Sequence, residues 1–227
     1  MQTIDIRGVI VPSDDHFIYD FFGITATCPS MVSDMLDSAD GEDVTVVINS
    51  GGGDVTAGQE IYTMLHEYPG NVVIHIYSMA ASAAAVIAMA RESEISPVAQ
   101  LMIHNVSTRS EGDYHDMEHA AEVLRNSNRA LANAFTAKTG KTMEEILAMM
   151  DRETWLSADQ AVEAGFVNRI MASKDRESSK QLQLAASLGG LLPQKAIDYA
   201  KAHIRNNTAL EKARAEYDYL ILEGNAK

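Results

Sequence analysis

Two side chains and one turn in this chain could together perform acyl transfer, because each follows an apolar run typical of a β-strand. Ser82 is the only hydroxyl in the alanine-rich run 79–90, His104 follows the run 100–103, and three glycines occupy positions 51–53. A serine at a helix start lies near unpaired backbone N–H groups, which suits a nucleophile, and a histidine could be its general base. Taken singly, the serine is equally a packing residue, the histidine a structural group and the glycines a tight turn. Their combination indicates chemistry.

The glycine turn follows the apolar run 44–49 and is rich in backbone donors. Glycine permits positive φ and close approach of another backbone, so the turn could hold an oxyanion or an extended peptide. It is not a nucleotide loop, since no Lys-Ser/Thr follows the glycines and the spacing of a dinucleotide fingerprint is absent.

The elements that position these residues alternate between strand and helix patterns, which predicts an α/β layer structure with crossover connections. After Pro69-Gly70 ends the second helix, the strand-then-helix pattern repeats. Ser157 is a plausible N-cap and Gly165 a plausible stop for the last core helix. Strands are predicted at 4–6 and 9–11, as one opening strand or a pair, and at 44–49, 72–77, 100–103 and 166–171. Helices are predicted at 29–39, 55–68, 81–90, 114–139, 143–150 and 158–165.

The domain organisation predicted from composition has three parts. Residues 1–172 form the core, and residues 173–192 form a polar linker because the composition shifts to charged and small residues there. Residues 193–227 read as a charged amphipathic helix, suited to docking or assembly.

Charge and composition exclude several classes of function. A net charge of −14 argues against a general nucleic-acid binder, since phosphate contacts need clustered Lys and Arg. Cys28 is the single cysteine, so an internal disulfide and a cysteine-based zinc cluster are excluded. The first residues lack the layout of a signal peptide, and the alanine-rich run is too short to span a bilayer. We therefore expect a soluble cytoplasmic protein with no membrane partner.

Six motifs follow one another along the chain. They are Asn49-Ser50-Gly51-Gly52-Gly53, Thr56-Ala57-Gly58, Met79-Ala80-Ala81-Ser82-Ala83, Met102-Ile103-His104, Trp155-Leu156-Ser157-Ala158 and the run 161–167. Together they resemble the Clp protease proteolytic subunit family, peptidase family S14. The resemblance covers residues 4–171 in unbroken order, and such a set is far more specific than any single motif. It is strongest to the shorter Clp-related proteases of tailed phages and prophages, which are often assigned to head maturation.

The resemblance implies roles for individual residues. Ser82 would be the nucleophile and His104 the general base. The backbone N–H groups of Gly53 and Ala83 would form the oxyanion hole, and Gly52 and Gly53 would contact the substrate.

The third member of the triad is open between two carboxylates. The family usually has Asp at the position of Glu153, and glutamate can orient a histidine if the backbone is placed to suit its longer side chain. Asp151 is the alternative. Both could equally be solvated acidic residues in the turn before Trp155.

The same resemblance implies the architecture and the partners. It implies a Clp protease/crotonase-like fold of repeated strand-strand-helix units, with a long handle helix at 114–139 and a C-terminal helical extension. The handle implies self-association into stacked rings, a heptamer or tetradecamer. Because the chain begins almost at the first core strand, we expect ATP-independent cleavage of a polypeptide substrate, such as a phage capsid or scaffold protein, with no metal and no cofactor.

Three other interpretations are open. The pattern His115-Asp116-Met117-Glu118-His119 matches H-x-x-E-H, an inverted zinc-protease motif, although no second motif with a further carboxylate follows. Enoyl-CoA hydratase-type enzymes share the broad fold and its oxyanion turns, but need no Ser-His pair. The chain could also be a catalytically inactive assembly subunit.

Overall fold

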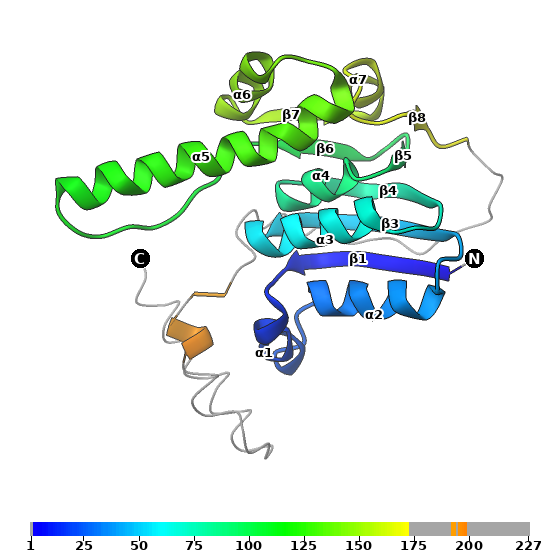
Figure 1. Cartoon of the computed structure of the whole chain (residues 1–227), viewed down its shortest axis with the longest axis horizontal. Helices are drawn as coiled ribbons and strands as arrows, with labels where there is room; N and C mark the ends of the chain where they lie inside the picture. The colour runs from blue at the N-terminus through cyan, green and yellow to red at the C-terminus, as the bar shows by residue number, and fades with distance from the viewer. Residues whose placement is uncertain (1, 173–191, 194, 199–227) are drawn as a thin grey trace.

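The computed structural model describes residues 2–172, 192–193 and 195–198. Its centre is a sheet with strand order β2-β1-β3-β4-β5-β8, in which all these strands run parallel (Figure 1). β6 pairs with the far end of β4, and β7 runs antiparallel to β6. The strands are β1 (Gln2–Ile10), β2 (Ala26–Thr27), β3 (Val44–Gly53), β4 (Val72–Ala81), β5 (Glu92–Ile95), β6 (Gln100–Ile103), β7 (Thr154–Ser157) and β8 (Arg169–Ile170).

Helices cover one face of this sheet, and α2, α3 and α4 lie in front of it in Figure 1. Such a covered parallel sheet is the α/β architecture that the alternating pattern predicts. The helices are the 3-10 turn η1 (Ser13–Asp15), α1 (His16–Phe21), α2 (Pro29–Ala39), α3 (Val55–Glu67), α4 (Ala83–Ala88), α5 (Tyr114–Thr139), α6 (Met143–Asp151) and α7 (Ala158–Glu163).

The sequence-based boundaries are confirmed where a local signal sets them. Pro29 occupies the first turn of α2, and Asp113 and Gly140 cap the two ends of α5. Ser157 caps α7, accepting from Gln160 N–H as predicted. The short elements α1, β2 and β5 were not predicted, because each is too short to carry a periodic pattern.

The opening segment, predicted as one strand or a pair, is a single strand, β1, which continues through a register shift at Gly8. Two other predicted boundaries are wrong. β4 runs on to Ala81, because its end pairs with β6, so α4 begins later than predicted. β8 is only two residues long, because the chain before it is tied to β5 by Asn168, which exchanges hydrogen bonds with the backbone of Ser93.

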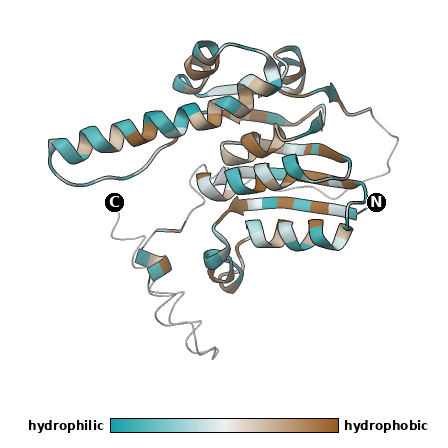
Figure 2. Cartoon of the chain, in the orientation of Figure 1, coloured by the Kyte–Doolittle hydropathy of each residue, from teal (hydrophilic) through white to brown (hydrophobic). Residues whose placement is uncertain are grey.

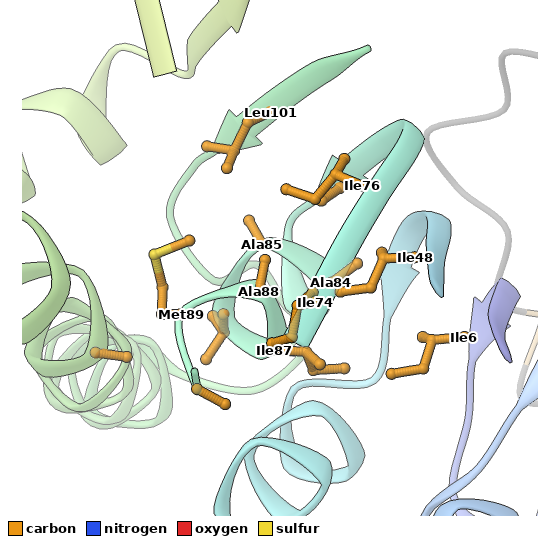
Figure 3. Packing of buried hydrophobic residues seen from close by; sticks show 14 of the residues in the cluster. Ile6, Ile48, Ile74, Ile76, Ala84, Ala85, Ile87, Ala88, Met89 and Leu101 are labelled. Carbon is orange, nitrogen blue, oxygen red and sulfur yellow. The ribbon is translucent and has the colours of Figure 1, made fainter. Parts of the chain in front are cut away.

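The main core lies between the sheet and the helices on its covered face (Figure 3). Ile48, Ile74 and Ile76 are fully buried and pack against the alanine-rich helix α4. Its small side chains let the helix lie close to the sheet. Gly58 of α3 extends this close packing, since a Cβ there would lie 2.9 Å from Ala83 Cβ.

Helix α5 projects from one side of the core, and most of its length is polar (Figures 1 and 2). Its buried residues lie between Leu131 and Phe135, whereas Tyr114 at its start is 67% exposed. Near its other end, Lys138 donates to Arg91 O and Asn168 Oδ1, and burial lowers the pKa of this lysine. The helix is therefore anchored mainly through its C-terminal third, and Asn128 adds a contact by accepting from Val106 N–H at 2.7 Å.

A second apolar cluster brings residues 192 and 197 together with residues from the first 30 positions of the chain. Leu192 and Ile197 are buried against α1 and the end of β1, and Leu192 N–H donates to Tyr19 Oη at 2.9 Å. Burial raises the pKa of Tyr19. The predicted linker 173–192 and C-terminal helix 193–227 lie almost entirely outside the described residues. Residues 195–198, within the predicted helix, are described and are helical. Both remain predictions.

No helix within the described ranges is long and apolar enough to cross a membrane.

The packing of β4 gives a first prediction. Ile74→Ala removes a fully buried side chain from the middle of the sheet and should lower the free energy of unfolding by about 2–5 kcal/mol. Val98→Ala removes a side chain that is 86% exposed and serves as the control, with a change within about 0.5 kcal/mol. Urea unfolding of both variants measures the difference, and equal midpoints would contradict the packing described here.

Candidate active site

Ser82 lies at the sharp turn between β4 and α4, in a backbone conformation that few serines adopt. Its φ is 56° and its ψ −125°, and positive φ costs free energy in a residue with a Cβ. The conformation is held from both sides: Ser82 N–H donates to Met102 O at 2.9 Å, and Ser82 O accepts from Ala85 N–H at 3.0 Å. A serine on such a strand-to-helix elbow presents its hydroxyl away from the sheet.

His104 lies against this hydroxyl because β6 pairs with the end of β4. The register places Ala81 beside Met102, and His104 follows two residues later. His104 Nε2 lies 2.8 Å from Ser82 Oγ, across 22 positions of sequence. The structure thus brings together the two side chains that the sequence singles out, at the distance over which a base can take a hydroxyl proton.

The glycine turn at the end of β3 packs against the same elbow. A Cβ on Gly52 would lie 2.6 Å from Ser82 Cβ and 3.0 Å from Ala83 N, and a Cβ on Gly53 would lie 2.1 Å from Ile10 O. Both glycines have positive φ. A side chain at Gly52 would push the turn away from Ser82, and one at Gly53 would push it away from β1.

Two backbone N–H groups are free to face a ligand in this corner. Asp54 N–H donates to Ile10 O at 2.8 Å, so the preceding N–H, that of Gly53, points to the other side of its strand. Ala83 is the first residue of α4, and its N–H has no acceptor inside the helix.

Ser50 is a supporting residue that the sequence reasoning missed. It is 2% exposed, donates to Gly8 O at 2.7 Å and accepts from Gly52 N–H at 3.0 Å. It therefore ties the glycine turn to β1. A buried hydroxyl directly before three glycines was the available signal.

Neither predicted carboxylate contacts His104. Among the described residues, Glu153 Oε1 accepts from Trp155 Nε1 at 3.0 Å, and Asp151 Oδ1 accepts from Asn105 Nδ2 at 2.8 Å. No ion pair joins His104 to either side chain. The described site is a Ser-His pair, and the two carboxylates of the segment before β7 are each held by another donor.

Glu153 lies beside the end of the strand pair that leads to His104. β6 and β7 are antiparallel, and their last pair is Ile103 with Thr154. Glu153 directly precedes Thr154 and His104 directly follows Ile103, so both residues adjoin this pair. Glu153 itself belongs to the turn before β7.

The part of the chain that the structure describes holds no group of three His, Cys, Asp or Glu side chains arranged to bind a metal ion. The residues of the H-x-x-E-H pattern, His115, Glu118 and His119, lie exposed on the projecting part of α5.

A serine on a strand-to-helix elbow, paired with a histidine beside donor-rich glycines on an α/β sheet, defines a serine-type peptidase. The sequence model described as "Clp protease" matches residues 26–174. The chain belongs to the Clp protease family.

Relatives and a solved structure agree with this family. The chain is 32% identical over 132 residues to the ATP-dependent Clp protease proteolytic subunit 2 of Tropheryma whipplei, covering 57% of this chain and 73% of the relative. It is 32% identical over 154 residues to subunit 1 of Leifsonia xyli subsp. xyli, covering 66% and 74%. A variant of ClpP1 from Listeria monocytogenes is similar in structure, with a TM-score of 0.62, 25% identity and coverage of 77% and 93%.

The glycine turn gives a second prediction. Gly53→Ala should lower kcat/KM for peptide hydrolysis by at least about a hundredfold, because its methyl group collides with Ile10 O and displaces the turn. Gly51→Ala is the matched control: no atom lies within 4 Å of a Cβ there and φ is not positive, so activity should stay within about twofold. Similar activities for the two variants would show that the turn's position is unimportant.

Proposed function

We propose that this protein is a serine endopeptidase in which Ser82 attacks the peptide carbonyl and His104 is the general base. The 2.8 Å contact between Ser82 Oγ and His104 Nε2 is the observation that carries this proposal. Nε2 takes the hydroxyl proton as the Oγ–C bond forms, and then gives it to the leaving amine as the C–N bond breaks. Water, activated by the same histidine, releases the acyl group.

The negative charge that develops on the carbonyl oxygen is proposed to lie between Gly53 N–H and Ala83 N–H. Both groups belong to the corner where the glycine turn packs on the elbow, and both are fixed by the surrounding backbone before substrate arrives. Preorganised donors of this kind stabilise the tetrahedral intermediate without reorganisation. The open side of Gly52 and Gly53 would bind the substrate backbone in extended form.

We propose Glu153 as the third member of the site, with the role of orienting His104. Its support is its place next to the last β6–β7 pair, Ile103 with Thr154, because Glu153 precedes Thr154 and His104 follows Ile103. Nε2 of His104 is occupied by Ser82, so the acid would accept from Nδ1. Asp151 is the second candidate, and its bond to Asn105 speaks against it.

The finer assignment that we propose is cleavage of phage head or scaffold proteins by a self-associated form of this chain. Its support is the resemblance to Clp-related proteases of tailed phages, together with the exposed side chains of α5, which offer a surface for a second copy. In such rings, a heptamer or a tetradecamer, the projecting helix would lie between subunits. The active site itself uses no nucleotide, so short peptides should be cleaved without ATP.

A third prediction tests the chemistry. Ser82→Ala and His104→Ala should each lower kcat for a short fluorogenic peptide by at least about a thousandfold, because each removes an atom that takes part in bond making. Circular dichroism and sedimentation should show the fold and assembly unchanged.

A peptide phosphonate should label the wild-type protein at Ser82 and leave Ser82→Ala unlabelled. Retained hydrolysis in Ser82→Ala would reject the proposal, and an unlabelled, inactive wild type would favour an assembly subunit.

A fourth prediction tests the substrate. Capsid and scaffold proteins produced together with the wild-type chain should be shortened, as measured by intact mass, and should keep full length with Ser82→Ala. The chain's own mass, measured in the same experiment, reports self-processing. Full-length structural proteins beside an enzyme that cleaves short peptides would contradict the head-processing role and leave the peptidase intact.

A further inference from the structure

We propose that Trp155 is a positioning residue that competes with His104 for the Glu153 carboxylate and so sets the fraction of molecules with an oriented base. This inference rests on the proposed Ser82–His104 peptidase with Glu153 as its third member. In the described structure the Glu153 carboxylate is bound to the indole, because Trp155 Nε1 donates to Glu153 Oε1 at 3.0 Å.

The position of Glu153 near two donors follows from the end of the β6–β7 ladder. The last pair of this ladder is Ile103 with Thr154. Glu153 directly precedes Thr154 and His104 directly follows Ile103, so both residues adjoin the same pair. The carboxylate is therefore bonded to the indole N–H of its own segment and belongs to the residue beside the pair that leads to His104.

The backbone of the turn is fixed, so the choice between donors belongs to the Glu153 side chain. Glu153 N–H donates to Met150 O at 3.1 Å and Thr154 Oγ1 donates to Met149 O at 2.7 Å, which ties the turn to the end of α6. Within this turn Glu153 has a φ of 50°. Rotation about its side-chain bonds moves the carboxylate while leaving these contacts in place.

Glu153 is easier to release than the other carboxylate. Trp155 is 37% exposed, so water can take the place of the carboxylate on its indole N–H. Asn105 Oδ1 is buried and has no hydrogen-bond partner among the described residues. If the Asp151 carboxylate moved away, Asn105 Nδ2 would lose its acceptor as well. An unpaired buried amide is costly, whereas an exposed hydrogen bond is nearly exchangeable with water.

The competition should be visible in kinetics. Trp155→Phe keeps the aromatic ring and removes the N–H donor, so kcat for a short peptide should rise by between about twofold and tenfold, the range for the net effect of one typical hydrogen bond. KM should stay unchanged, because the substrate contacts are not altered.

In a Glu153→Ala background, Trp155→Phe should have no effect on kcat, since the carboxylate is gone. Tyr77→Phe changes an exposed side chain of β4; it is the control and should change neither kcat nor KM.

The single tryptophan of the chain allows a test without substituting it. A peptide phosphonate bound to Ser82 carries a charged oxygen that favours protonated His104, which should draw Glu153 away from the indole. The emission of Trp155 should then change in the wild type and stay constant in Glu153→Ala.

The outcomes separate this inference from the function on which it rests. An unchanged or lower kcat in Trp155→Phe, or an effect of the same size in the Glu153→Ala background, would overturn the competition. Constant emission in the labelled wild type would overturn it as well, even if Trp155→Phe failed to fold. In both cases an inactive Ser82→Ala leaves the peptidase in place, whereas an active Ser82→Ala removes the peptidase itself.

Discussion

The pairing of β6 with the end of β4 is the constraint on which the rest of the site depends. This short parallel ladder prolongs β4 beyond the point where β5 leaves it, and its last member supplies the carbonyl that holds the elbow, Met102 O. The same ladder places His104 against Ser82. This one ladder therefore both stabilises the unfavourable backbone conformation of Ser82 and brings His104 to its hydroxyl.

Small residues make the approach of these elements possible. α4 is built largely of alanine, Gly58 lets α3 lie against Ala83, and Gly52 lets the β3 turn touch Ser82. Each contact is closer than any larger side chain permits. The alanine run that looks like simple packing in the sequence is thus a condition for the chemistry, since a thicker helix would lift Ser82 away from the glycine turn.

The sequence predicts the parts of this molecule whose causes are local. α2 and α5 have their predicted bounds because a proline, a capping aspartate and a glycine mark their ends. α1 was not predicted, since tertiary contacts with Val11 and Leu192 stabilise it rather than its own pattern. The orientation of Glu153 could not be predicted, because it depends on side-chain rotation and on a neighbouring indole rather than on residue type.

The antiparallel pairing of β6 and β7 also limits how the lengths of its connecting segments can change. Successive residues of a strand face opposite sides, so moving the β6–β7 register by one position would turn Glu153 and Trp155 to the other face. A change between α6 and β7 that shifts this register is therefore tolerated only in steps of two residues. The loop between His104 and the start of α5 lies outside the ladder, and insertions there leave the pairing intact. Variation in chain length is thus easier between His104 and α5 than between α6 and β7.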